Sequence, residues 1–99
     1  MKPAEARKII RERARNSAHI VILSHARRQM TARDIDDLDV QRVLTGGAIT
    51  EGPYRPTDRP ELWRCNVRGC IAGDRIEVVV DIPPEPPLLY VITAMALGR

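Results

Sequence analysis

Phenylalanine is absent from this 99-residue sequence, and one tryptophan and two tyrosines are its only aromatic side chains. The hydrophobic core must therefore be aliphatic, built from Ile, Val and Leu. The shortage of rings also argues against a single-strand binding protein that stacks successive bases on rows of aromatic side chains. Because a chain of this length has no room for two independent cores, residues 1–99 are predicted to form a single domain.

Long hydrophobic runs and cysteines are also scarce. The longest apolar-rich run, residues 88–97, is too short to cross a bilayer. No apolar segment of the signal-peptide type follows the charged start of the chain. The two cysteines fit a reduced protein without structural disulfides. We therefore expect a cytoplasmic protein with no membrane partner.

Several catalytic motifs are missing, namely the Walker loop, GxGxxG, HExxH and GxSxG. A zinc site could be drawn from His19, His25, Cys65 and Cys70. However, the two cysteines lie five residues apart, so in one continuous strand they would point to opposite faces. The alternative is that Cys65 is a small buried hydrophobic residue. We predict neither a metal nor a cofactor.

Positive charge is concentrated at the start of the chain. Residues 1–33 contain nine Lys and Arg against two Glu, a net charge of +7. Residues 34–99 have a net charge of −4, so the total of +3 hides a basic N-terminal third. This asymmetry favours a polyanion, or an acidic partner protein, at that end. The alternative is a helix face that is merely solvated.

Helix signals lie in the first half of the chain, where apolar residues recur at helical spacing around one short β-branched run. Pro3 suits the first turn of a helix. Ser24, and then Asp36 or Asp37, suit the N-caps of two further helices. The predicted organisation is a basic helix in residues 1–17, followed by a short strand and two helices in residues 18–47.

Strand signals fill the second half. Residues 62–67 and residues 75–82 alternate between apolar and polar side chains, as strands with one buried face do. Residues 88–95 are apolar on both faces, which indicates the central strand. We therefore predict antiparallel strands in residues 48–97. The expected fold is α+β, with N-terminal helices packed on a three- to four-stranded antiparallel sheet.

His25 is the best candidate for a chemically active side chain. A neutral imidazole near the start of a helix can act as a general base. Arg28 and Gln29 follow at three and four residues, so both can share its side of the helix. The alternative is that His25 only packs against, or caps, a neighbouring loop.

Arg64 and Arg68 lie on one side of an alternating strand. If that side flanks the helix of His25, then His25 and Arg64 share one open, positively charged hollow. Such a hollow suits phosphate, because guanidinium groups bind its oxygens bidentately. The alternative is a solvated strand face whose arginines form salt bridges with Glu77 or Asp81.

A longer pattern resembles a known family. The spacing H-A-x-x-x-M-x-x-R-x-I, from His25 to Ile35, resembles the start of a bacterial family catalogued only as a domain of unknown function. The resemblance continues through V-x-x-V-L-x-x-G-x-I-x-E, from Val40 to Glu51, and closes at V-I-T in residues 91–93. It covers roughly residues 18–95.

This family is similar to compact toxins of the RelE and MqsR type, which are metal-independent messenger-RNA endonucleases neutralised by a protein antitoxin. The resemblance implies a RelE/MqsR-like fold. It also implies two partners, which are RNA, including RNA on the ribosome, and an antitoxin protein.

Metal-free RNA cleavage needs a base for the 2′-OH proton, cations for the crowded phosphorane and an acid for the leaving 5′-oxygen. We assign His25 to proton transfer, and Arg28, Arg33 and Arg64 to phosphate stabilisation, as the hypothesis for a toxin-like endoribonuclease. The second acid is not identified. The alternative function is a non-catalytic RNA- or protein-binding module of the same fold.

Overall fold

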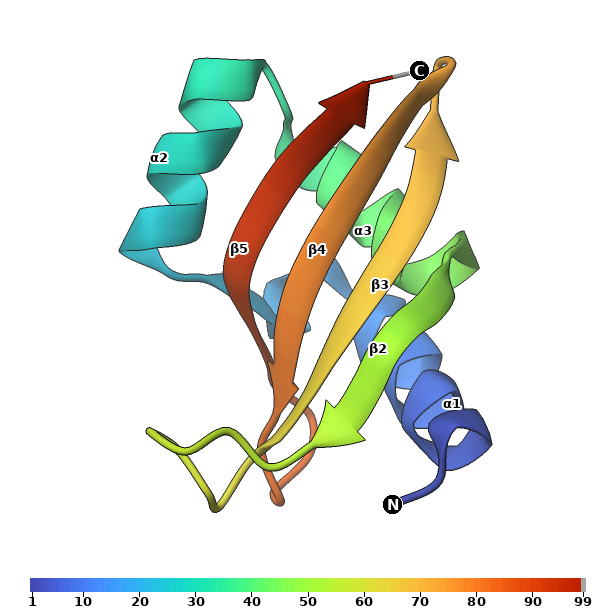
Figure 1. The fold of residues 1–99 in the computed structure, drawn as a ribbon, viewed down its shortest axis with the longest axis vertical. Helices are drawn as coiled ribbons and strands as arrows, with labels where there is room; N and C mark the ends of the chain where they lie inside the picture. The colour runs from blue at the N-terminus through green and yellow to red at the C-terminus, as the bar shows by residue number, and fades with distance from the viewer. Residues whose placement is uncertain (99) are drawn as a thin grey trace.

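The computed structural model describes residues 1–98, which form an α+β fold of three α-helices and a five-stranded sheet (Figure 1). No helix in these residues is both long enough and apolar enough to span a membrane. The helices are α1 (Pro3–Ala14), the 3₁₀ turn η1 (Ser17–His19), α2 (Ser24–Arg33) and α3 (Asp37–Gly46). The strands are β1 (Ile20–Ile22), β2 (Ala48–Tyr54), β3 (Trp63–Ile71), β4 (Asp74–Ile82) and β5 (Leu89–Gly98).

The sheet is mixed, with strand order β1-β5-β4-β3-β2. Neighbours from β2 to β5 are antiparallel, whereas β1 pairs parallel to β5, with Ile20 opposite Leu89. The predicted sheet of three to four antiparallel strands is therefore wrong in strand number and in the direction of β1. The prediction that residues 88–95 form the central strand is also wrong, because β4 occupies the centre. A three-residue strand contains no local signal for a partner so distant in the chain.

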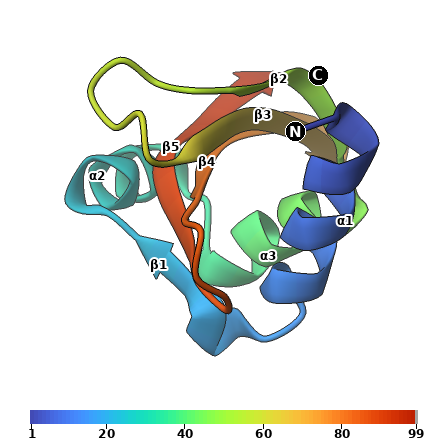
Figure 2. The ribbon, with the colours of Figure 1, turned by 90° about the horizontal axis from the view of Figure 1, so that it is seen from below.

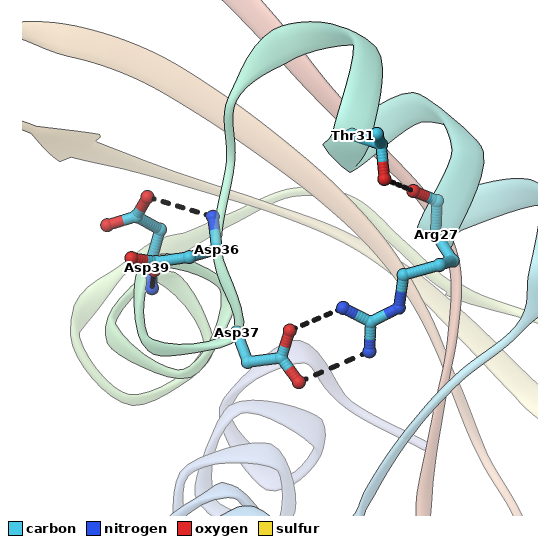
Figure 3. Close-up of polar contacts among 5 residues, drawn as sticks. All are labelled: Arg27, Thr31, Asp36, Asp37 and Asp39. Atoms are coloured by element: carbon cyan, nitrogen blue, oxygen red, sulfur yellow. Dashed lines mark hydrogen bonds and ion pairs between the residues drawn. The ribbon is translucent and has the colours of Figure 1, made fainter.

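Helices α1 and α3 begin as their sequences predict. Pro3 lies in the first turn of α1. A capping box starts α3: the Asp39 N–H donates to Asp36 Oδ1 at 2.7 Å, and the Asp36 N–H donates to Asp39 Oδ2 at 3.2 Å (Figure 3). The sequence left Asp36 and Asp37 open as the cap, and the structure selects Asp36.

Helix α2 begins differently from the prediction. Ser24 is its first helical residue, and Leu23 occupies the N-cap position without a side-chain hydrogen bond. The helix ends at Arg33, and the C-cap residue Asp34 adopts a left-handed conformation with φ 56°. Arg27 binds both carboxylate oxygens of Asp37, at 2.5 and 3.2 Å, and so ties α2 to the start of α3 (Figure 3).

The sheet is curved, and α1 and α3 pack inside the curve (Figure 2). Strands β3 and β4 turn Cys65, Val67, Val78 and Val80 toward this side, where each is at most 2% exposed. The opposite face carries no helix, and α2 lies beside β5 at the edge of the sheet (Figure 1). The fold therefore leaves one sheet face and the adjoining side of α2 for a functional site.

Candidate functional site

The helix-free face of the sheet carries a polar stripe from β3 and β4. Register places Arg64 opposite Asp81, and Arg68 opposite Glu77. The polar stripe predicted on β3 is therefore present, and each of its arginines faces a carboxylate on the neighbouring strand. The local cause is the alternation of both strands, which sends their apolar side chains to α1 and α3 and their charged side chains to the other face.

Arg64 is held by two carboxylates. Its Nε donates to Asp81 Oδ1 at 2.6 Å, its Nη2 donates to Asp81 Oδ2 at 2.9 Å, and its Nη1 lies 3.5 Å from Asp58 Oδ1. The Arg64 side chain is 16% exposed and that of Asp81 is 1% exposed. These hydrogen bonds to the Asp81 carboxylate raise the pKa of Arg64. The alternative prediction of a salt bridge across the strands is confirmed, so a phosphate would have to compete with Asp81 for this guanidinium.

The second pair of the stripe is more open. Arg68 Nη2 donates to Glu77 Oε1 at 3.3 Å, and Thr50 Oγ1 donates to the same oxygen at 3.1 Å. Three polar atoms near this pair, Arg68 Nε, Asn66 Oδ1 and Thr93 Oγ1, are buried without a hydrogen-bond partner in residues 1–98. Buried polar atoms are normally satisfied, so these three are exceptions on this face, and a ligand could reach them only after a rearrangement of the side chains around them.

His25 and Arg28 lie on the solvent side of α2. Ala26 and Met30 are 0% and 1% exposed, which fixes the opposite side of the helix against the core. His25 and Arg28 are exposed, and neither has a polar partner among residues 1–98. Their three-residue spacing places them on one side of the helix. An imidazole and a guanidinium are thus available together, as the sequence predicts.

Gln29 shows how this part of α2 is oriented. Its Oε1 accepts a hydrogen bond from the Ala94 N–H at 3.0 Å. The pairing of β1 ends at Val91, so the Ala94 amide lies on a free edge of β5 and requires another acceptor. His25 precedes Gln29 by four residues and shares its side of the helix. His25 therefore lies on the side of α2 that borders β5.

A hollow of about 160 Å³ lies at the start of α2. Leu23 forms part of its wall, two residues before His25, whereas His25, Arg28 and Arg33 do not line it. Its charged lining comprises two arginines and two aspartates, so the expected hollow of net positive charge shared by His25 and Arg64 is not what the structure presents. The lining residues are Leu23, Asp58, Arg59, Arg64, Asp81 and Ile92.

Arg33 stands at the far end of α2 from His25. The eight residues between them correspond to about 12 Å along the helix axis. Arg33 is exposed, has no polar partner in residues 1–98, and borders a hollow of about 340 Å³ between α2 and the end of β5. His25 and Arg33 therefore lie at opposite ends of α2 and border different parts of the surface.

The two cysteines fit the alternative to a zinc site, in which Cys65 is a small buried hydrophobic residue. Cys65 is buried in the core, as expected of a small hydrophobic residue, and Cys70 is exposed. Burial, with a smaller contribution from the Asp81 charge, raises the pKa of the Cys65 thiol to about 11. Within the described chain, no three His, Cys, Asp or Glu side chains are grouped as metal ligands.

Two arginine contacts have no clear signal in the sequence. The Arg55 guanidinium stacks 3.9 Å from the centroid of the Trp63 ring, which fastens the loop after β2 to β3. Arg27 forms an ion pair with Asp37, although the sequence predicts no partner for either Arg27 or Arg28. Both contacts depend on how loops and helices meet in space, and only the i, i+3 spacing to His25 distinguishes Arg28 beforehand.

Comparison with known proteins gives one match. A family model described as "Domain of unknown function (DUF4258)" matches residues 22–96, from the end of β1 through α2, α3 and most of the sheet. The predicted resemblance to a family of unknown function is confirmed. No curated protein and no solved structure matches the chain.

Proposed function

The chain belongs to the family described as Domain of unknown function (DUF4258), and from this premise we propose that it is a toxin-like, RNA-directed protein whose α2 face contacts the RNA backbone. One observation carries the proposal: His25 and Arg28 are exposed on one side of α2 and have no polar partner in residues 1–98. An unpaired guanidinium beside an imidazole is a suitable contact for phosphate.

Support also comes from the surroundings of α2. The N-terminal third of the chain, which includes α2, has a net charge of +7. This charge favours an anionic ligand. The resemblance to RelE- and MqsR-type toxins, which rests on the sequence pattern, adds messenger RNA as the substrate and an antitoxin as the second partner.

In the catalytic form of the proposal, His25 accepts the 2′-OH proton of the RNA. The 2′-oxygen then attacks phosphorus, the bond to the 5′-oxygen breaks, and the leaving oxygen takes its proton from solvent. The products are a 2′,3′-cyclic phosphate and a 5′-hydroxyl end. Arg28 stabilises the charge that develops on the phosphorane. Arg33 binds a neighbouring phosphate, and Arg64 positions β3, β4 and the loop of Asp58 rather than the phosphate.

The experiment is incubation of the purified protein with RNA in EDTA, followed by mapping of fragment ends. Cyclic phosphate ends that disappear in His25→Ala, but persist in the matched variant His19→Ala, support the proposal. His19 is a suitable control because it is the other histidine and lies in η1, where its Nε2 is 3.3 Å from Asn16 Nδ2. Equal cleavage by the parent and His25→Ala would remove His25 from the mechanism.

A second candidate is an RNA-binding module that does not cleave. Cleavage needs an acid that protonates the leaving oxygen. Within residues 1–98, no acidic side chain is hydrogen-bonded to His25 or Arg28, and this favours a module that binds without cleaving. Binding that weakens steeply with salt, without cleavage products, would select this module over the nuclease.

A further inference from the structure

Helix α1 carries a row of cations separate from the α2 site. Lys8, Arg11 and Arg15 follow one another at intervals of three and four residues, so they lie on one side of the helix. All three are exposed. With Ala4, Arg7 and Glu12, they border a shallow hollow of about 360 Å³.

The other arginines of α1 serve the fold. Arg7 donates to the Gly47 carbonyl oxygen and so joins α1 to the end of α3. Arg13 donates to the Pro83 and Leu88 carbonyl oxygens, at 2.8 and 3.1 Å, and so joins α1 to the connection between β4 and β5. Lys8, Arg11 and Arg15 make no such contact within residues 1–98. The packing of α1 against the rest of the protein therefore does not depend on these three side chains.

The row is unfavourable for the isolated helix. Cations three and four residues apart repel each other, and repulsion of this kind destabilises a helix. Glu5 and Glu12 lie three or four residues from members of the row, but neither forms an ion pair with it within residues 1–98. The helix is held instead by a narrow buried stripe of Ala6, Ile10 and Ala14. With three cations against two carboxylates, this side of the helix keeps a net positive charge that an anionic ligand would neutralise.

Helix α1 is also separate from the α2 site. Figure 2 shows α1 beyond α3 on the concave side of the sheet, whereas α2 lies at the edge formed by β5. The family match begins at residue 22, after the end of α1. The basic helix therefore lies outside the residues that the family model matches.

We propose that Lys8, Arg11 and Arg15 form a second RNA surface that binds the sugar–phosphate backbone without reading bases, an inference that rests on the proposed RNA-directed function. Steps of three and four residues separate the cations by about 4.5 and 6 Å along the helix, which lets them follow consecutive phosphates of one strand. The row offers no aromatic or amide side chain for base recognition. RNA that extends beyond the α2 site is the occupant.

The test uses the full chain and a fluorescein-labelled single-stranded RNA of mixed sequence, about 20 nucleotides long, with binding measured by anisotropy between about 50 and 200 mM salt. The variants are Arg11→Glu and Arg15→Glu, with Arg75→Glu as the control of equal charge change. Arg75 is exposed on β4 and has no polar partner in residues 1–98. Circular dichroism checks that each variant is folded.

We expect each α1 variant to weaken binding about fivefold or more, and to lower the slope of log K against log salt by about 0.7, the loss of one phosphate contact on a single strand. Arg75→Glu should change binding less than twofold. If the α1 variants bind like Arg75→Glu while Arg28→Glu loses binding, the α1 surface is overturned and the α2 function stands. If the parent protein does not bind the RNA, both proposals fail. If α1 binds an acidic protein and not RNA, the proposed RNA surface on α1 is also overturned.

Discussion

Arg64 on β3 and Asp81 on β4 form a two-point ion pair, with donor–acceptor distances of 2.6 and 2.9 Å, on the helix-free face of the sheet. Asp81 is the one buried charged residue among those described, at 1% exposure. A buried carboxylate is tolerated only when it is paired and hydrogen-bonded. The pair therefore fixes the position of Arg64 and limits what this arginine can offer to a ligand.

The first prediction concerns the stability that depends on this pair. Asp81→Asn leaves the largely buried Arg64 guanidinium without its main counter-charge, and breaking a buried ion pair typically costs about 3 kcal/mol or more. We expect the free energy of unfolding, measured by urea denaturation, to fall by about that amount.

The matched control is Glu77→Gln, which breaks the neighbouring pair with Arg68. The Arg68 side chain is 40% exposed and that of Glu77 is 12% exposed, so this pair is more open to solvent than Arg64–Asp81 and we expect a smaller loss. Equal and small losses in the two variants would contradict the structural role given to Asp81.

The second prediction concerns His25. If its imidazole transfers the proton, His25→Ala should slow RNA cleavage by about 10²–10⁴-fold. The free energy of unfolding should hardly change, because the side chain is exposed and has no polar partner in residues 1–98. Cleavage rates and urea denaturation, measured on His25→Ala and His19→Ala together, separate a chemical role from a structural one.

The third prediction uses two adjacent arginines of α2. Arg28 is unpaired within residues 1–98, whereas Arg27 binds both oxygens of Asp37. Arg28→Ala should weaken RNA binding severalfold and lower its salt slope by about 0.7, the contribution of one phosphate contact. Arg27→Ala removes the same charge and should leave binding nearly unchanged. A larger loss in Arg27→Ala would show that the RNA approaches α2 from the side of α3.

Local signals were sufficient for the starts of α1 and α3, but not for the start of α2 or for the sheet. The capping box at Asp36 and the proline at Pro3 act within one helical turn, so the sequence shows them directly. The parallel pairing of Ile20 with Leu89 joins segments that are 69 residues apart in the sequence. Its direction depends on where the connection after β4 returns the chain, which no neighbouring residue specifies.

In the candidate site, too, some features follow from local sequence patterns and others depend on the three-dimensional fold. The exposure of His25 and Arg28 follows from the helical spacing of Ala26 and Met30, and the sequence therefore predicts it. Alternation on β3 and β4 predicts that Arg64 faces either a ligand or a carboxylate. Only the three-dimensional structure decides between these two, because the burial of Asp81 depends on the surrounding fold.

The fourth prediction concerns the two thiols. Burial raises the pKa of Cys65 to about 11, so at about pH 8 this thiol stays protonated and inaccessible. Cys70 is exposed and serves as the internal control. We expect a thiol reagent such as 5,5′-dithiobis(2-nitrobenzoate) to modify Cys70 rapidly in the folded protein, and to modify Cys65 only after unfolding. Because the thiolate is the reactive form, raising the pH toward 11 should accelerate Cys65 only where the fold also opens. Rapid modification of both thiols under native conditions would mean that the core around β3 is open to solvent, and the packing of Cys65 against Val67, Val78 and Val80 would have to be abandoned.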